Sequence, residues 1–152
     1  MHKILFICHG NICRSAAAEY ICKYLLKKYE LDKNYFVFSR GTSNEEFGND
    51  MYPPMKQELR KNGIPFDDHF ARKVTINEIE NSDYIFYMDN FNLRNLKYID
   101  SKNTNKYRII TFLTNKFDEI EDPWYTGNFD KVFNQLFESI ELIIRGIKDG
   151  QI

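Results

Sequence analysis

The sequence predicts an α/β fold in which an open, four-stranded, mainly parallel sheet has helices on both faces. Short apolar runs typical of buried strands alternate along the chain with longer segments whose apolar residues recur at helical spacing. In addition, the first strand, first helix and second strand follow one another at the spacing of a βαβ unit, in which the strands are parallel and the crossover is right-handed. We expect residues 1–152 to form a single domain.

The first three elements are recognised from the spacing of apolar residues. Residues 4–7 form an unbroken apolar run, which is typical of a buried strand. From Ser15 to about residue 29 apolar residues recur at helical spacing with lysines on the other face, and Ser15 is a suitable N-cap. Cys22 falls among the apolar positions of this helix, so we expect it to pack in the core. After a turn, residues 35–39 are predicted to form the second strand.

The middle of the chain is predicted to contain two short helices. Two consecutive prolines open a helix over residues 53–61, and an Asn-Gly pair closes it. Thr75 and Glu78 have the spacing of a capping box, which predicts a helix ending near residue 81. The segments before these helices, residues 40–52 and 64–72, are predicted to be loops.

The second half of the chain completes the sheet. Its third strand is apolar on both faces and is therefore expected to be central. The elements predicted here are a strand over 83–88, a helix over 89–98, a strand over 107–112, a long loop over 114–128 and an amphipathic helix over 129–148.

Composition and charge exclude several classes of protein. A formal net charge of −1 gives no reason to expect nucleic acid or a membrane surface as a partner. Three cysteines, an odd number, argue against a disulfide scaffold and for a reducing compartment. The apolar run before Cys8 is too short for a signal peptide, and no stretch approaches the roughly 20 apolar residues of a membrane span. We therefore expect a cytoplasmic protein, and we expect it to be a monomer.

The segment from Cys8 to Ser15, with the sequence Cys-His-Gly-Asn-Ile-Cys-Arg-Ser, has the features of a loop that binds a tetrahedral oxyanion. None of residues 9–14 is proline, so each backbone N–H can point inward, and the N-terminus of the following helix adds its positive dipole end. Arg14 can grip two phosphoryl oxygens with its planar guanidinium group. In this field we expect the sulfur of Cys8 to be a thiolate near neutral pH. The sequence therefore predicts a phosphate-binding loop after the first strand.

Other interpretations of this segment are weaker. Cys8 and Cys13 could form a metal or redox pair, or both could be small buried apolar residues. However, Gly10 and Asn11 are the residue types that best tolerate the left-handed backbone of such a loop, and they have no use in an apolar core. The anion-binding interpretation is therefore the stronger one. Within it, Cys13 could capture an oxidised Cys8 as a disulfide, or could simply pack behind the loop.

Two segments resemble the low-molecular-weight protein tyrosine phosphatases. The loop of residues 8–15 resembles the signature of that family, and Asp122-Pro-Trp-Tyr resembles its Asp-Pro-aromatic-aromatic loop. Between them, three further segments resemble stretches of the family in the same order, namely Gly63-Ile64-Pro65, His69-Phe70-Ala71-Arg72 and Tyr84-Ile85-Phe86-Tyr87-Met88-Asp89. The resemblance covers nearly the whole chain.

The resemblance implies a two-step hydrolysis of phosphotyrosine and of small aryl phosphates, as by an acid phosphatase, without metal or cofactor. Cys8 would attack phosphorus and form a cysteinyl-phosphate. Arg14 and the loop amides would stabilise charge on the equatorial oxygens. Asp122 would protonate the departing tyrosyl oxygen and then remove a proton from the attacking water.

Further residues are assigned to binding and support. The phosphate group is expected to contact the loop residues His9, Gly10, Asn11, Ile12, Cys13, Arg14 and Ser15. Trp124 and Tyr125 are candidates for one wall of a pocket for the phenyl ring. Ser15 is also expected to donate a hydrogen bond to the sulfur of Cys8. The resemblance implies a supporting group in which Glu19 pairs with His69, as a functional or merely structural pair, and whose members are Asn11, Ser39, His69, Glu19 and Asp89.

Acidic residues are numerous on two loops that could edge this pocket. These residues are Glu45 and Glu46 on one loop and Asp118, Glu119 and Glu121 on the other. If both loops lie at the pocket, their charges repel acidic peptides, which predicts a preference for neutral or basic residues beside the phosphotyrosine. Alternatively, the carboxylates point to solvent and only keep the protein soluble.

Two other functions fit part of the pattern. A thiol-dependent arsenate reductase on the same fold would relay oxidation to later cysteines, but beyond the loop the chain has only Cys22, inside a predicted helix. A phosphotyrosine-binding module would need the loop and Arg14 but would have no use for a thiolate or for Asp122. The partners expected are phosphotyrosine-containing proteins or peptides, with phosphate, sulfate or vanadate as small ligands of the loop.

Overall fold

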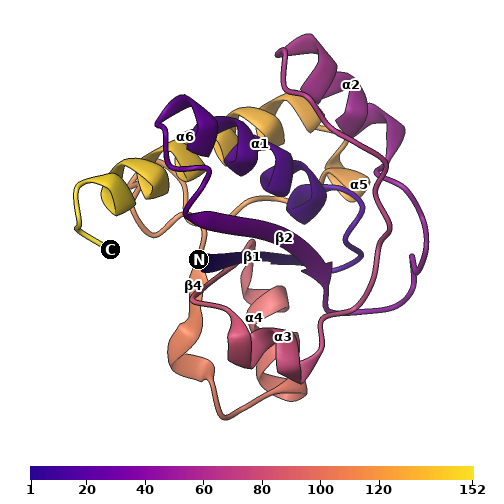
Figure 1. Ribbon diagram of the computed structural model, residues 1–152. Helices are drawn as coiled ribbons and strands as arrows, with labels where there is room; N and C mark the ends of the chain where they lie inside the picture. The colour runs from indigo at the N-terminus through magenta and orange to yellow at the C-terminus, as the bar shows by residue number, and fades with distance from the viewer.

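The computed structural model describes all 152 residues and has the alternating strand and helix order that the sequence predicts (Figure 1). In chain order the elements are β1 (His2–Cys8), α1 (Arg14–Lys28), β2 (Tyr35–Gly41), α2 (Pro53–Lys61), α3 (Ile76–Asn81), β3 (Tyr84–Tyr87), α4 (Asn90–Ile99), the 3₁₀ helix η1 (Thr104–Lys106), β4 (Tyr107–Ile109), α5 (Pro123–Thr126) and α6 (Phe129–Lys148).

The four strands form one sheet in the order β2-β1-β3-β4, and all three neighbouring pairs are parallel. The predicted α/β fold is therefore confirmed, and β3 is central, as its apolar sequence predicts. Within the sheet, β2 lies next to β1 on one edge, and β3 lies next to β1 on the opposite edge. The carboxyl end of β1 is thus the point where the strand order reverses, which is where ligands bind in open α/β sheets. Cys8 is the last residue of β1.

Helices cover both faces of the sheet, and β1 contributes alternate residues to two apolar cores (Figure 1). Ile4 and Phe6 pack in the larger core, which contains buried residues of α1, α2 and α6. Leu5 and Ile7 pack in the smaller core with Ile79 of α3 and residues of α4. Because consecutive side chains of a strand point to opposite faces, a strand buried on both sides reads as an unbroken apolar run.

Most predicted element boundaries agree closely with the structure. Helices α2, α3 and α6 have the predicted bounds, and the capping box of Thr75 and Glu78 is present. Cys22 is buried in the larger core, as predicted. No helix is long and apolar enough to cross a membrane.

Three details of the predicted elements are wrong. Ser15 does not cap α1, because the helix begins at Arg14 and the N-cap position is Cys13, which makes no side-chain capping bond; the Ser15 hydroxyl contacts Cys8. β4 ends at Ile109 rather than at residue 112, since the chain turns there while Ile110 remains buried. The predicted long loop contains α5, for which Asp122 is the N-cap and Gly127, at a φ of 75°, the C-cap.

Candidate active site

The loop that joins β1 to α1 turns on one left-handed residue, Asn11, which has a φ of 62°. Its backbone N–H points at the sulfur of Cys8, 3.3 Å away. The expectation that Gly10 shares this left-handed conformation is wrong, because Asn11 alone in the loop has a positive φ. Gly10 provides space instead: a Cβ atom there would lie 3.3 Å from Cγ of Glu46.

A directed chain of hydrogen bonds ends on the sulfur of Cys8. The side-chain amide of Asn11 donates to Oγ of Ser15 at 2.9 Å and lies 3.1 Å from Oγ of Ser39. Because the Ser15 oxygen already accepts this bond, its own proton is free to point at the Cys8 sulfur, 3.0 Å away. The backbone N–H of Arg72 donates to Oδ1 of Asn11 at 3.2 Å and so fixes the orientation of the amide. Two donors, the Asn11 N–H and the Ser15 hydroxyl, therefore favour negative charge on the sulfur.

His69 supports the same loop through the backbone. Its Nε2 atom lies 2.5 Å from the carbonyl oxygen of Asn11, and since a carbonyl only accepts, Nε2 carries the proton. No hydrogen bond or ion pair joins Glu19 to His69, so that predicted pair is wrong. Glu19 instead accepts from Oγ of Ser39 at 2.8 Å and faces Lys23. Burial lowers the pKa of His69 from its ordinary value of 6.5, although the bond to Asn11 opposes this.

Asp50 fixes the segment that carries His69. Its carboxylate accepts from the backbone N–H groups of His69, at 2.9 Å, and Met51, at 2.7 Å, and pairs with Lys56. Although burial works against the charge, these partners hold the pKa of Asp50 below its usual value. The sequence contains no local signal for this role, because Asp50 lies in a polar loop distant from His69 along the chain.

Arg14, at the start of α1, is buried beneath the pocket with both ends of its guanidinium group oriented. Nη1 donates to Asp89 at 2.7 Å and to the carbonyl of Ile120 at 2.9 Å, while Nη2 lies 3.5 Å from Asp122. Burial opposes the charge, but Cys8, Asp89 and Asp122 outweigh it and raise the pKa of Arg14. The guanidinium group therefore remains charged, and Asp89, assigned only to the supporting group from sequence, contacts it directly.

Asp122 is held at the pocket by α5. One carboxylate oxygen accepts from the backbone N–H of Trp124 at 3.0 Å as the helix N-cap, and the other faces Arg14. The ring of Trp124 packs at a tilt against Tyr52, with centroids 4.8 Å apart, and this contact positions Trp124 in the pocket lining. Tyr125 is largely exposed at the rim of the pocket.

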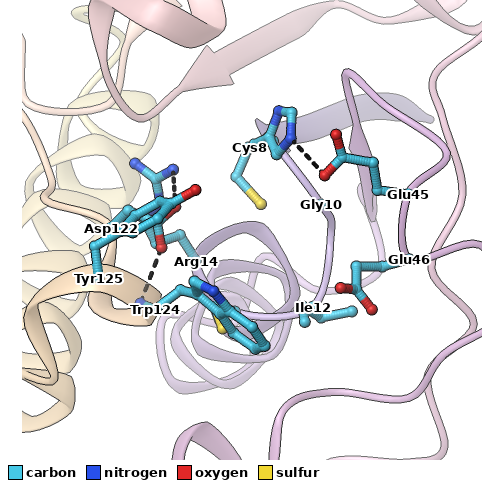
Figure 2. A pocket seen from close by; sticks show the side chains of 11 residues that line it. Cys8, Gly10, Ile12, Arg14, Glu45, Glu46, Asp122, Trp124 and Tyr125 are labelled. Carbon is cyan, nitrogen blue, oxygen red and sulfur yellow. Dashed lines mark hydrogen bonds and ion pairs between the residues drawn. The ribbon is translucent and has the colours of Figure 1, made fainter.

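These groups converge on one pocket of about 480 Å³, including its open mouth (Figure 2). Its lining residues are Cys8, His9, Gly10, Ile12, Cys13, Arg14, Glu45, Glu46, Asp122, Trp124 and Tyr125. Of the residues assigned to ligand binding, only Asn11 and Ser15 do not line it; both are fully buried and support Cys8 from behind. No group of three or more His, Cys, Asp or Glu side chains is placed to hold a metal ion.

The structure adds Gly41 to the site, which the sequence analysis missed. Gly41 pairs with Cys8 across the parallel strands, and a Cβ atom there would lie 2.6 Å from the carbonyl oxygen of His9. Only glycine leaves room for that backbone. The sequence shows a glycine directly after the predicted second strand, but the register that places it beside Cys8 is seen only in the structure.

Cys13 is a free, buried thiol in the pocket lining. Burial, together with the charge of Cys8, raises the pKa of the Cys13 thiol, so it stays protonated. Of the two thiols in the loop, therefore, Cys8 is the one surrounded by donors that favour a thiolate.

Comparison with known proteins agrees with this geometry. A sequence model described as low molecular weight phosphotyrosine protein phosphatase matches residues 3–149. The chain is 33% identical over 151 residues to the low molecular weight protein-tyrosine-phosphatase YfkJ of Bacillus subtilis, covering 97% of each chain. It is 32% identical over 157 residues to the low molecular weight protein-tyrosine-phosphatase PtpA of Staphylococcus aureus, covering 100% of this chain and 98% of PtpA.

Solved structures show the same similarity across the whole fold. The crystal structure of YfkJ superposes with a TM-score of 0.94 at 32% identity, over 100% of this chain and 98% of YfkJ. That of a protein tyrosine phosphatase from Entamoeba histolytica, which has Hepes in its active site, superposes with a TM-score of 0.91 at 29% identity over 100% of both chains. The protein described here belongs to the low molecular weight phosphotyrosine protein phosphatase family and is accordingly a hydrolase.

Proposed function

We propose that this protein hydrolyses phosphotyrosine and small aryl phosphates in two steps, with Cys8 as nucleophile and without a metal ion or cofactor. One observation carries the proposal: a sulfur with two donors aimed at it, a buried guanidinium group and a capped carboxylate line the same pocket. These are the groups that phosphoryl transfer through a covalent intermediate requires.

In the first step the Cys8 thiolate attacks phosphorus in line with the departing oxygen. A sulfur–phosphorus bond forms and the bond from phosphorus to the tyrosyl oxygen breaks. Asp122 starts protonated and donates its proton to that oxygen, so tyrosine leaves as a neutral phenol. Arg14 and the backbone N–H groups of the loop bind the equatorial oxygens, on which the transition state carries its charge.

In the second step a water molecule attacks the phosphorus of the cysteinyl-phosphate. Asp122, now ionised, accepts a proton from that water, and the sulfur–phosphorus bond breaks to release phosphate. The Ser15 hydroxyl, 3.0 Å from the sulfur, stabilises the thiolate as it leaves. The cycle as proposed therefore begins with the proton on Asp122 and not on Cys8.

The pocket suits phosphotyrosine among phosphorylated side chains. Cys8 and Arg14 offer contacts for the phosphate group, and Trp124 and Tyr125 in the same lining offer aromatic contacts for the phenyl ring. Proteins or peptides with phosphotyrosine are the proposed substrates, with phosphate, sulfate or vanadate as competing ligands and a monomer as the active unit.

The decisive experiment is hydrolysis of p-nitrophenyl phosphate in a chelator, with no metal added. Cys8→Ser should abolish turnover while vanadate still binds, and Arg14→Lys should be nearly inactive because a point charge does not replace a two-pronged donor. Asp122→Asn should slow aryl phosphates with poor leaving groups roughly 10²–10⁴-fold while sparing activated ones. Turnover by Cys8→Ser above a buffer blank would exclude the proposed nucleophile.

Assays with arsenate and with phosphopeptides separate the two alternative functions. An arsenate reductase would turn over arsenate with reducing thiols and would not need Asp122, whereas a binding module would hold phosphopeptides without hydrolysing them. The structure offers little for the reductase relay, because Cys22 is fully enclosed in the larger core and cannot reach the pocket without unfolding α1.

A further inference from the structure

Two carboxylates edge the mouth of the pocket on the side away from α5. Glu45 and Glu46 follow β2 and both line the pocket, and Figure 2 shows them across it from Asp122 and Tyr125. The side chain of Glu45 is 71% exposed, so its charge faces the solvent through which a peptide would approach.

Neither carboxylate is neutralised by a lysine or arginine within 4 Å. Glu45 contacts Nε2 of His9 at 3.1 Å, and Glu46 accepts from the side-chain amide of Asn49 at 2.6 Å. Both carboxylates therefore stand at the rim without a lysine or arginine partner. Arg14 also lines the pocket, but it is buried and already faces Asp122. In a substrate complex it would bind the phosphate group and so would not neutralise Glu45 or Glu46.

The acidic residues that precede Asp122 do not belong to this rim. None of Asp118, Glu119 and Glu121 lines the pocket, so the condition that both acidic groups edge it is not met. Glu121 is paired with Lys131 at 2.6 Å, and Glu119 accepts from the backbone N–H of Asn90 at 3.0 Å. Any electrostatic selection by the rim therefore depends on Glu45 and Glu46.

When a phosphotyrosine ring fills the pocket, the peptide backbone must cross its mouth, which places neighbouring side chains beside these carboxylates. We infer that Glu45 and Glu46 form a subsite for a lysine or arginine next to the phosphotyrosine, and that they disfavour acidic neighbours. This inference rests on the proposed function, since it concerns substrates of the same pocket. Complementary charges at the rim act mainly on the rate of association and on the choice between substrates. The preference should therefore appear in kcat/KM and should weaken as salt screens the charges.

The test compares phosphotyrosine peptides that differ only in having Lys, Gln or Glu on both sides of the phosphotyrosine. At low ionic strength the wild type should turn over the Lys peptide about fivefold to tenfold faster than the Glu peptide in kcat/KM, as expected for one or two exposed ion pairs. The ratio should approach one in high salt. Because the ratio is taken within one protein, any change common to all substrates cancels.

Substitutions locate the effect. In Glu45→Gln with Glu46→Gln the Lys-to-Glu ratio should fall to about one, and Glu45→Lys should reverse the preference. Glu80→Gln makes the same charge change on α3, outside the pocket lining, and should keep the wild-type ratio. Equal turnover of the two peptides by the wild type, or a Lys preference that survives in the double variant, would overturn the inference.

Binding keeps this test separate from the test of hydrolysis. The Kd values of the same peptides for Cys8→Ser protein should show the same order, Lys tighter than Gln and Gln tighter than Glu. If p-nitrophenyl phosphate is not hydrolysed by the wild type, the proposed function fails, while the order of Kd values still decides whether the rim selects. An order that is flat or reversed contradicts the subsite.

Discussion

The hydroxyl groups of Ser15 and Ser39 are oriented by the single side-chain amide of Asn11. Since the amide nitrogen can only donate, the proton of Ser15 is directed to the Cys8 sulfur, and that of Ser39 to Glu19 at 2.8 Å. All the bonds around Asn11 depend on its left-handed backbone, which few residues other than glycine and asparagine adopt readily. One residue thus sets both the shape of the loop and the polarity around the sulfur.

Replacing Ser15 with alanine removes the hydrogen bond between its hydroxyl and the Cys8 sulfur, and so tests this arrangement. A hydrogen bond to a charged group contributes about 1.5–3 kcal/mol, so kcat should fall roughly 10- to 100-fold in Ser15→Ala. The limb of the pH–rate profile that reports thiolate formation should also move to higher pH. Both are measured with an activated aryl phosphate across the acidic range.

Ser139→Ala is the matched control for Ser15→Ala. Ser139 is equally buried, but it lies on α6 and its hydroxyl has no partner. Its removal should leave kcat and the pH profile unchanged. A Ser15→Ala enzyme with the wild-type profile would show that the hydroxyl does not act on the sulfur.

At the scale of whole elements, two helix N-termini each present a capping carboxylate to Arg14. Asp89 caps α4 and accepts from the backbone N–H of Asn92 at 2.9 Å, while its other oxygen binds Arg14. Asp122 does the same at α5, between Trp124 N–H and Arg14. A carboxylate that is held as an N-cap has few rotamers left, so these helices fix the orientation of the guanidinium group.

The contact between the end of β2 and the loop predicts a severe effect for Gly41→Ala. The added Cβ atom would lie 2.6 Å from the carbonyl oxygen of His9 and 3.2 Å from that of Ser43, and backbone atoms cannot move aside cheaply. We expect a loss of about 1–3 kcal/mol in the free energy of unfolding, together with weaker vanadate binding because the loop is displaced. Urea unfolding and vanadate titration measure the two effects.

Gly10→Ala is the comparison for Gly41→Ala. Its new Cβ atom would meet a flexible side-chain atom, Cγ of Glu46, at 3.3 Å. The Glu46 side chain can rotate away, so the cost in stability should be clearly smaller than that of Gly41→Ala. Equal costs would mean that the close approach of Gly41 to His9 is not what restricts this position.

The elements that the sequence predicts well are those with a local signal. The run of residues 4–7, the prolines of α2 and the capping box of α3 each specify their element without reference to distant residues. β4 is shorter than its apolar pattern because the chain turns at Ile110, whose N–H still bonds to the Tyr87 carbonyl of β3 and whose side chain packs in the larger core. α5 was missed because a four-residue helix has no apolar period, although its Asp-Pro start and Gly127 end were visible.

The site was predictable where the chemistry is local and not where it depends on tertiary contacts. Cys8, Arg14 and Asp122 stand in short motifs, and all three line the pocket. By contrast, the partners of Glu19 and the role of Asp50 depend on how separate loops pack, which spacing along the chain does not report. The same holds for the acidic rim, to which only one of the two acidic groups belongs.

At the scale of the whole molecule, burial of His69 links stability to pH. The folded protein binds the His69 proton less tightly than the unfolded chain does, because burial lowers the pKa of this group below 6.5. When the pH falls through 6.5, the unfolded state takes up the proton first and is stabilised. The contribution of His69 is therefore fully present above 6.5 and is lost progressively below it. The lowered pKa of Asp50 acts at more acidic pH, below its ordinary 3.8.

Wild-type protein should accordingly have a Tm that falls between pH 7 and pH 5, and His69→Gln should show a shallower fall over the same window. Glutamine cannot take up a proton but keeps an N–H that can reach the Asn11 carbonyl, so the comparison removes the titration rather than the bond. His2 is an exposed histidine at the start of β1, so His2→Gln is the control. This variant should keep the wild-type dependence of Tm on pH. Thermal unfolding is followed by circular dichroism in buffers of constant ionic strength. If His69→Gln and wild type lose stability in parallel from pH 7 to pH 5, the burial of His69 is not the source of the pH dependence.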